Sequence, residues 1–409
     1  MGKIELDHTG AGSGITLSSD GTDLLLNGTA VGGGGTALEL YAENPSSPTA
    51  PSATGTNAVA IGTGAVASNT ESIAIGGDTL SSGYKSFAAA IGNSYFTYGA
   101  QGFASIAIGL QSKANQTAAV SIGQSSSATS SNAAALGFNS VASGSGSLAL
   151  GNVSRSSGTQ SISLGDSYAS GADSFAAAIA NNTSSYGATG ANSVAMGDRA
   201  KASATHATAI GTSVTASSTD GAVAMGSSST ASGLGSFASG YLNIASGHYS
   251  QAIGFAASTQ SIYGKFAKSS NFFNNYADMQ TGTLVVVAAT TDATPKVLTS
   301  NKGAASATNQ VILSNNSAYA FHGTIVARQQ ASAGTACAAW KIEGLIRREG
   351  SAGTTVLVNS ATTVLDNTPA WVMALSADTT NGGLAITVTG AAATNIRWVA
   401  TVHTSEVIY

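Results

Sequence analysis

Cysteine is nearly absent from this 409-residue chain, which contains a single one, Cys337. An internal disulfide and a cysteine-based metal site are therefore excluded. Charged residues are also scarce, at 8% of the chain, and the net charge of −4 comes without any run of lysine or arginine. Such a sequence does not predict a surface that binds nucleic acid.

Long apolar runs are missing as well. The sequence contains no apolar stretch of about 18 residues, the length that a transmembrane helix needs, so we expect no membrane insertion. Residues 1–5 do not begin the apolar core of a secretion signal, so we expect synthesis in a cytoplasm and no Sec export. Proline is rare, but three of the five prolines, Pro45, Pro48 and Pro51, lie close together, which predicts a linker over residues 41–56.

Glycine, by contrast, is abundant, and many of the 50 glycines end a short repeated phrase. The phrase first reads Ala-Val-Ala-Ile-Gly at residues 58–62, and it returns in variant form about every fourteen residues. A fixed short period of this kind predicts a solenoid, in which each repeat is one coil stacked on the last. The residues that close the phrases are Gly62, Gly76, Gly92, Gly109, Gly123, Gly137, Gly151, Gly165, Ala180, Gly197, Gly211, Gly226, Gly240 and Gly254.

Within each phrase, large apolar residues alternate with alanine or serine, and this period of two predicts a strand. Two short strands and two glycine-bounded turns fit a coil of this length, so we expect a flattened parallel β-roll of about fourteen coils over residues 57–262. Aliphatic surface left outside such a thin roll would favour association about a long axis, and we infer a trimer. The residues predicted to form the core of the roll are Val59, Ile61, Ile73, Ile75, Ile106, Ile108, Val120, Ile122, Leu148 and Leu150.

Two longer coils interrupt the period. Residues 77–109 align without gaps to residues 165–197, and each segment carries an insertion that contains aromatic residues. In the first insertion, Tyr95 and Tyr98 are candidates for contact with a ligand such as a glycan. The plainer interpretation is an insertion that packs on the neighbouring coil.

The two ends of the chain differ from the repeat. Residues 1–40 predict a small β-element for attachment, because Asp-Gly and Asn-Gly pairs separate short apolar runs. Residues 263–280 break the repeat and predict a neck or cap. Residues 281–409 contain all three tryptophans and about eight β-patterned runs, which predicts a β-sandwich or jelly-roll domain with the tryptophans in its core.

The sequence does not predict an active site. The five histidines lack metal-ligand spacing, and we expect no catalytic residue, no bound metal and no cofactor. Enzymes that cut polysaccharide need paired carboxylates, and nothing supports a pairing of Asp166 with Asp173. Arg347 and Arg348 are candidates for binding an acidic surface glycan, although an exposed hairpin end gives the same pattern.

The phrases at residues 59–62 and 72–76, repeated at a period of fourteen, resemble the head repeats of trimeric autotransporter adhesins. This resemblance covers about half of the chain and implies a left-handed parallel β-roll and a homotrimer. The membrane-anchoring β-barrel of that family is not expected here, because a different β-rich domain occupies residues 281–409.

The flanking segments resemble structural proteins of tailed phages, especially marine ones, at residues 2–10, 281–284, 340–348 and 396–400. This resemblance implies a tail fibre on the virion, made in the host cytoplasm and without enzymatic activity. Its N-terminus would bind another virion protein, and its C-terminal domain would bind a glycan or protein of the host surface. The alternatives are a bacterial trimeric adhesin head, a capsid-attached fibre or decoration protein, and a tailspike that depolymerises polysaccharide.

Overall fold

The computed structural model describes residues 4–6, 15–19, 24–26, 29–30, 49–90, 97–177, 185–330 and 335–409. The chain divides into two compact units, residues 1–126 and 127–409. The described residues form β-strands and one short 3-10 helix, η1 (Ala352–Thr354), and they contain no α-helix. The prediction of an all-β protein is confirmed.

Four strands near the N-terminus form an antiparallel sheet in the order β1-β2-β3-β4. Leu26 pairs with Thr29, and the predicted Asn-Gly turn at residues 27–28 lies outside the described residues. Residues 41–48 of the predicted linker also lie outside them, whereas residues 49–56 are described and include the strand β5 (Ser52–Ala53), which pairs in parallel with residues 66–67. The strands are β1 (Ile4–Leu6), β2 (Ile15–Ser19), β3 (Leu24–Leu26) and β4 (Thr29–Ala30).

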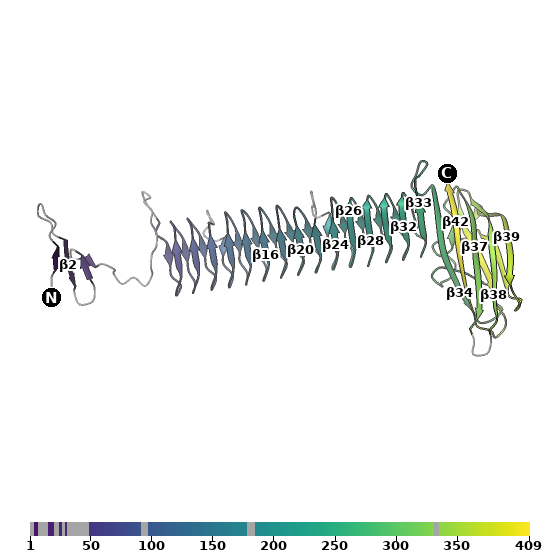
Figure 1. Ribbon diagram of the computed structural model, residues 1–409, viewed down its shortest axis with the longest axis horizontal. Helices are drawn as coiled ribbons and strands as arrows, with labels where there is room; N and C mark the ends of the chain where they lie inside the picture. The colour runs from purple at the N-terminus through teal and green to yellow at the C-terminus, as the bar shows by residue number, and fades with distance from the viewer. Residues whose placement is uncertain are drawn as a thin grey trace. The chain divides into compact units, whose positions relative to one another are not determined.

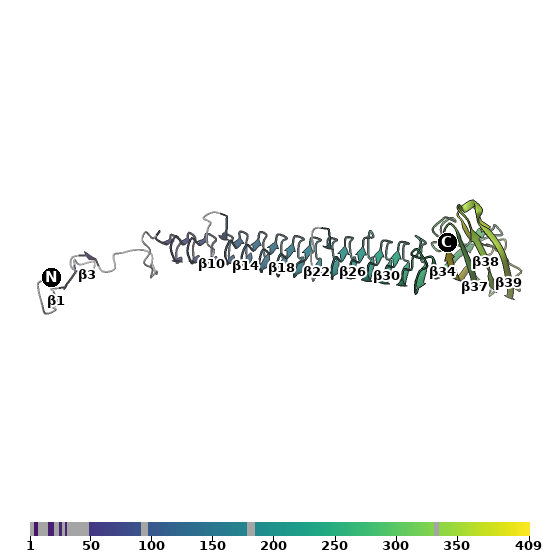
Figure 2. The ribbon, with the colours of Figure 1, turned by 90° about the horizontal axis from the view of Figure 1, so that it is seen from above.

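Two parallel ladders build the solenoid part of the first unit, where each coil contributes one strand to each ladder (Figure 2). The first, called the long ladder, has strands of at least three residues, and the second, called the short ladder, has strands of two. The long ladder contains β6 (Val59–Ile61), β8 (Ile73–Ile75), β10 (Phe87–Ala89), β12 (Ile106–Ile108) and β14 (Val120–Ile122). The short ladder contains β5 (Ser52–Ala53), β7 (Val66–Ala67), β9 (Leu80–Ser81), β11 (Gly99–Ala100) and β13 (Lys113–Ala114).

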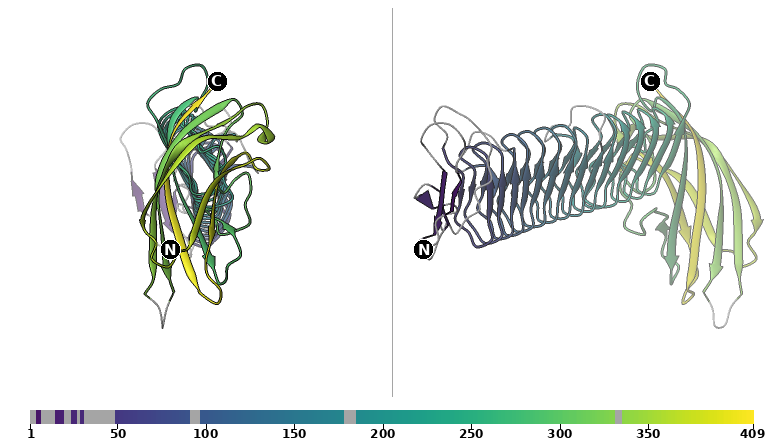
Figure 3. Two further views of the ribbon diagram at one scale, coloured as in Figure 1. Left: turned by 90° about the vertical axis from the view of Figure 1, so that its right-hand side faces the viewer. Right: turned by 60° about the vertical axis from the view of Figure 1, so that its left-hand side comes forward.

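The second unit repeats this arrangement in its own solenoid part, where the coils lie stacked one after another (Figure 3). Parallel pairing continues to β33, which ends at Ser269, and the predicted parallel β-solenoid is confirmed. The long ladder contains β16 (Ala134–Leu136), β18 (Leu148–Leu150), β20 (Ile162–Leu164), β22 (Phe175–Ala177), β24 (Val194–Met196), β26 (Thr208–Thr212), β28 (Val223–Ser227), β30 (Phe237–Tyr241), β32 (Gln251–Phe255) and β33 (Phe266–Ser269). The short ladder contains β15 (Ser127–Ala128), β17 (Val141–Ala142), β19 (Arg155–Ser156), β21 (Tyr168–Ala169), β23 (Gly187–Ala188), β25 (Lys201–Ala202), β27 (Thr215–Ala216), β29 (Thr230–Ala231) and β31 (Ile244–Ala245).

The interior of the roll is filled by alanine and serine. Ala107 is fully buried at the centre of β12, as is Ser121 in β14, whereas Ile75 and Leu150 are 39% and 45% exposed. Facing strands of so short a coil leave room between them for small side chains, and the alternation then turns both large neighbours outward. The prediction that ten large residues form the core is therefore wrong for the single chain. These outward residues are Val59, Ile61, Ile73, Ile75, Ile106, Ile108, Val120, Ile122, Leu148 and Leu150, each exposed or half-buried.

The long coils are in a different register from the one that the glycines predict. Ala88 pairs with Ala74 on one side and with Ala107 on the other, so the irregular spacing resolves into one step of 14 residues and one of 19. Ala90, with a φ of 54°, therefore follows this strand where Gly76 follows β8. The predicted closing residues Gly92 and Ala180 lie outside the described residues.

Glycine is required where the coils stack most closely. Gly62 has a φ of 115°, and a Cβ atom there would lie 2.8 Å from the carbonyl carbon of Gly76 in the next coil. That separation is too short for carbon atoms that are not bonded, so the repeat of the closing glycine follows from the stacking of the coils.

The C-terminal part of the second unit is a β-sandwich of two antiparallel sheets, as the strand pattern predicts. Their core contains Trp340, Trp371 and Trp398, and the stacked rings of Trp340 and Trp398 lie with centroids 5.8 Å apart. The first sheet, called the tip sheet, has the order β34 (Met279–Thr290), β42 (Ile396–Ile408), β37 (Ser317–Gln329), β38 (Cys337–Arg348) and β39 (Val356–Asp366) (Figure 1). In the second, β41 (Gly383–Thr389) pairs with β40 (Val372–Asp378), β35 (Lys296–Val297) and β36 (Val311–Ile312).

Candidate functional site

The most extensive candidate surface is the outward side of the long ladder. Parallel pairing in register places large apolar residues directly above one another, as in the pairs Ile106–Val120 and Leu148–Ile162. Their exposure is substantial: 45% for Leu150, for example. Each unit therefore presents a row of half-exposed aliphatic side chains, called the aliphatic stripe. Surfaces of this kind mark sites of protein association.

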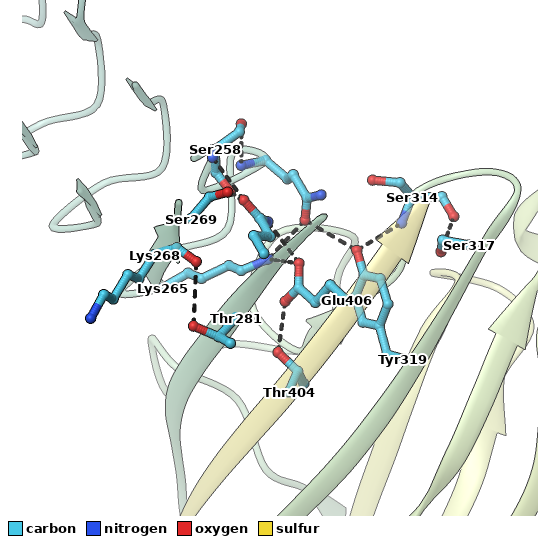
Figure 4. Close-up of polar contacts among 12 residues, drawn as sticks. Ser258, Lys265, Lys268, Ser269, Thr281, Ser314, Ser317, Tyr319, Thr404 and Glu406 are labelled. Atoms are coloured by element: carbon cyan, nitrogen blue, oxygen red, sulfur yellow. Dashed lines mark hydrogen bonds and ion pairs between the residues drawn. The ribbon is translucent and has the colours of Figure 1, made fainter. Parts of the chain in front are cut away.

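A second cluster joins the last coil to the tip sheet, and its centre is a buried ion pair (Figure 4). Lys265, just before β33, places its Nζ atom 2.8 Å from Oε2 of Glu406 on β42, and the two side chains are 4% and 1% exposed. Glu406 also accepts hydrogen bonds from Gln280 Nε2 and Thr404 Oγ1, each at 2.7 Å. Lys265 donates a further bond to Gln260 Oε1 at 2.8 Å.

Burial explains the electrostatics of this cluster. It lowers the pKa of Lys265, although the Glu406 carboxylate acts in the opposite direction. Burial also raises the pKa of Tyr319, with a further contribution from the negative charge of Glu406. Tyr319 remains a phenol that donates to Gln260 Oε1 at 3.3 Å. The ion pair and its hydrogen bonds connect the solenoid to the sandwich, and this cluster around Lys265 and Glu406 is called the joint.

The joint continues through Gln280 at the start of β34. Its side chain accepts a hydrogen bond from the backbone N–H of Ser258 and donates one to the carbonyl oxygen of the same residue, both at 2.9 Å. Ser258 belongs to the last turn of the solenoid, which is thereby bound to the tip sheet. The sequence carries no local signal for this cluster, because Lys265 and Glu406 are 141 residues apart.

The two candidate arginines make different contacts, although both line one hollow of about 300 Å³ at the end of β38. Arg347 is exposed on β38 and makes an ion pair with Glu349. Arg348 is half-buried, and its Nη1 atom donates to the carbonyl oxygen of Leu313 at 2.7 Å, so it fixes a loop of the sandwich. Alternation along the strand turns the two side chains to opposite sides of the sheet. A role of Arg347 and Arg348 in glycan binding stays a prediction.

The candidate tyrosines are only partly described. Tyr95 lies outside the described residues, and Tyr98 is half-buried next to β11. Among the described residues, no group of three or more histidine, cysteine, aspartate or glutamate side chains could hold a metal ion. A helix long and apolar enough to cross a membrane is likewise not found in the described part of the chain.

These coils match the family model of the YadA head domain repeat. The match supports a shaft that is similar to the head repeats of trimeric autotransporters. The match ends at residue 257, so it does not include the joint or the β-sandwich. No curated protein matches the chain. The matched residues are 53–79, 100–126, 128–154, 142–167, 188–213, 220–243 and 231–257.

Proposed function

We propose that this protein is a homotrimeric, adhesin-like fibre that attaches a larger particle or cell to another surface. The observation that carries the proposal is the aliphatic stripe. Residues such as Leu150, Ile162 and Met196 are 45%, 37% and 40% exposed on a solenoid whose interior is already full. Covering such side chains is favourable by about 25 cal/mol for each Å² removed from water. Three chains that pack side by side along the long ladder of each unit cover its stripe.

The head-repeat match supports the same assembly, because the shaft resembles those of trimeric autotransporters. A trimer would hold three copies of the β-sandwich together. Contacts that are individually weak then act jointly, because the second and third binding events occur at a high effective concentration. The proposed function is therefore mechanical and adhesive, without catalysis.

We further assign the fibre to the virion of a tailed phage. The resemblance of residues 2–10, 281–284, 340–348 and 396–400 to phage structural proteins supports this assignment. In this arrangement the N-terminal strands bind another virion protein, and the β-sandwich binds a glycan or protein of the host surface. A bacterial trimeric adhesin is the second candidate, and the head-repeat match supports it equally.

The trimer is tested by light scattering on the full-length protein, which should give a mass of about 120 kDa, three times 39.9 kDa. Leu150→Asp places a carboxylate in the aliphatic stripe and should lower the mass to that of one chain. Phe138→Asp is the matched control, because Phe138 is 52% exposed but lies at a corner outside the long ladder. A monomeric unsubstituted protein would contradict the proposal.

The biological setting is tested by immunogold labelling with antibody against the purified protein. Gold at the distal ends of tail appendages would support the phage fibre. Gold on the capsid would keep the trimer but assign it to particle decoration. Gold on bacterial cells that carry no phage would favour the bacterial adhesin.

A further inference from the structure

The tip sheet has an unusual outer side. Its inner side forms the core of the β-sandwich, yet its outer side is also rich in valine, and Val285, Val326, Val399 and Val407 are 48%, 52%, 39% and 48% exposed. An antiparallel sheet with one side in water normally alternates apolar and polar residues. Apolar residues on both sides are the pattern of a sheet that is covered twice.

We propose that this outer side, called the tip face and formed by the outward residues of β34, β42, β37 and β38, is an interface between copies of this chain. The inference rests on the proposed trimer and extends it beyond the head repeats. It assigns the β-sandwich a part in assembly as well as in attachment.

Several apolar residues of the tip face form rows that cross neighbouring strands. Val399 on β42 lies between Val287 on β34 and Val326 on β37. A second row, close to the solenoid, contains Met279 and Val407. Beside that second row is a shallow hollow of about 410 Å³, with a largely apolar lining, that can receive side chains of a neighbouring copy. Apolar rows with a hollow at one corner suit a protein partner.

The continuity of the sheet indicates that the partner covering the tip face is another copy of this chain. β32 pairs with β33, and β33 pairs with β34, so the long ladder of the solenoid runs directly into the tip sheet (Figure 1). The register places outward Ile253 beside outward Lys268, and Lys268 beside outward Thr281. The aliphatic stripe of the second unit and the tip face are therefore one side of one sheet. Copies that cover the stripe extend over the tip face.

Several polar residues of the tip face are paired within the chain. His322 and His403 lie opposite each other on neighbouring strands, with stacked rings whose centroids are 5.2 Å apart. His403 Nδ1 lies 3.1 Å from Thr283 Oγ1. Lys341 and Glu343 form an ion pair at 3.3 Å. Because these groups have partners, covering them costs less free energy than burying unpaired polar groups would.

The experiment measures thiol protection in the full-length protein. The single native cysteine is first removed as Cys337→Ser. Val399→Cys or Ser405→Cys then places one thiol on the tip face. Ser405→Cys is included because serine and cysteine are nearly isosteric, so this variant should fold even if Val399→Cys does not. The matched control is Val372→Cys, because Val372 is 55% exposed on β40 in the other sheet. Maleimide labelling rates of the native proteins are compared, and the mass of each variant is measured by light scattering.

We expect trimeric variants in which the thiols at positions 399 and 405 react at least about tenfold more slowly than the thiol at position 372. Equal labelling rates in protein of trimeric mass would overturn the tip-face interface and leave the trimeric shaft standing. A monomeric mass for the control variant would overturn the interface and the proposed trimer together.

Discussion

The buried ion pair between Lys265 and Glu406 offers a sharp test of how the solenoid and the sandwich are joined. In the variant Lys265→Met, the side chain keeps most of its volume but loses its charge. The Glu406 carboxylate, 1% exposed, is then left without a cation. Removing one partner of a buried pair costs about 3–5 kcal/mol, because the remaining charge is buried without compensation.

The structure places the expected loss at the lower end of that range. Gln280 and Thr404 still donate hydrogen bonds to Glu406 after the substitution, each at 2.7 Å. We therefore expect Lys265→Met to lower the free energy of unfolding by about 3 kcal/mol. The additional change Glu406→Gln removes the orphaned charge, and the double variant should recover about 2 kcal/mol of that loss.

Denaturant unfolding of the full-length protein, followed by tryptophan fluorescence, measures this effect, because all three tryptophans lie in the sandwich core. The joint binds the last turn of the solenoid to the tip sheet, so its loss should also separate the unfolding of sandwich and solenoid. Two observations would refute the reasoning. One is a Lys265→Met variant as stable as the unsubstituted protein. The other is a double variant whose loss of unfolding free energy equals the sum of the losses measured for Lys265→Met and Glu406→Gln separately.

Three further predictions concern the interior of the coils, the close approach at the joint, and the turn that precedes β34. Ala107→Leu should destabilise the solenoid by about 1–3 kcal/mol, because Ala107 is fully buried between Ala88 and Ser121 of the adjacent coils; a variant that unfolds at the same denaturant concentration would contradict the assignment of the interior. Gly282→Ala should lower the melting temperature, since the added Cβ atom would overlap Glu406 Oε1 and Thr404 Oγ1, whereas Gly350→Ala, which has open space around it, should not. At Asp278, burial raises the pKa, but N–H donors of Phe273, Asn274 and Asn275 outweigh it and hold the pKa below 3.8. The stability from Asp278 is therefore present above about pH 4 and lost as pH falls through the lowered value, and Asp278→Asn should flatten the dependence of melting temperature on pH in this acidic window.

The architecture could be predicted because its signals are local. The period of the closing glycine reports the stacking of coils, since a Cβ atom at Gly62 would collide with Gly76 one coil further on. The period of two within each phrase reports a strand. Both signals repeat many times, so they survive variation in any single coil, and together they give a parallel solenoid.

The register of the long coils could not be predicted in the same way. The sequence signal there is the next available glycine, Gly92, but the strand ends two residues after Phe87 and Ala90 adopts the positive φ instead. An alanine can adopt this conformation at a moderate cost in free energy, so the glycine rule fails at this coil. The joint was hidden for a different reason, because its charged residues come from segments far apart in the chain.

The prediction of which side of each strand faces the interior was also wrong, and this error bears directly on function. Alternation of Ile106, Ala107 and Ile108 fixes which residues share a side, but it does not say which side is the interior. A strand in a wide sandwich buries its isoleucines, whereas a coil as narrow as this one has room for the alanine alone. The isoleucines then remain outside, and a chain that keeps large aliphatic residues at such positions needs something to cover them. The alternation of large and small residues therefore led to a wrong core for the single chain, but the same alternation supports an apolar core shared among chains. In the proposed trimer, burial of the aliphatic stripe would add hydrophobic stabilisation to that of the alanine and serine interior of each roll.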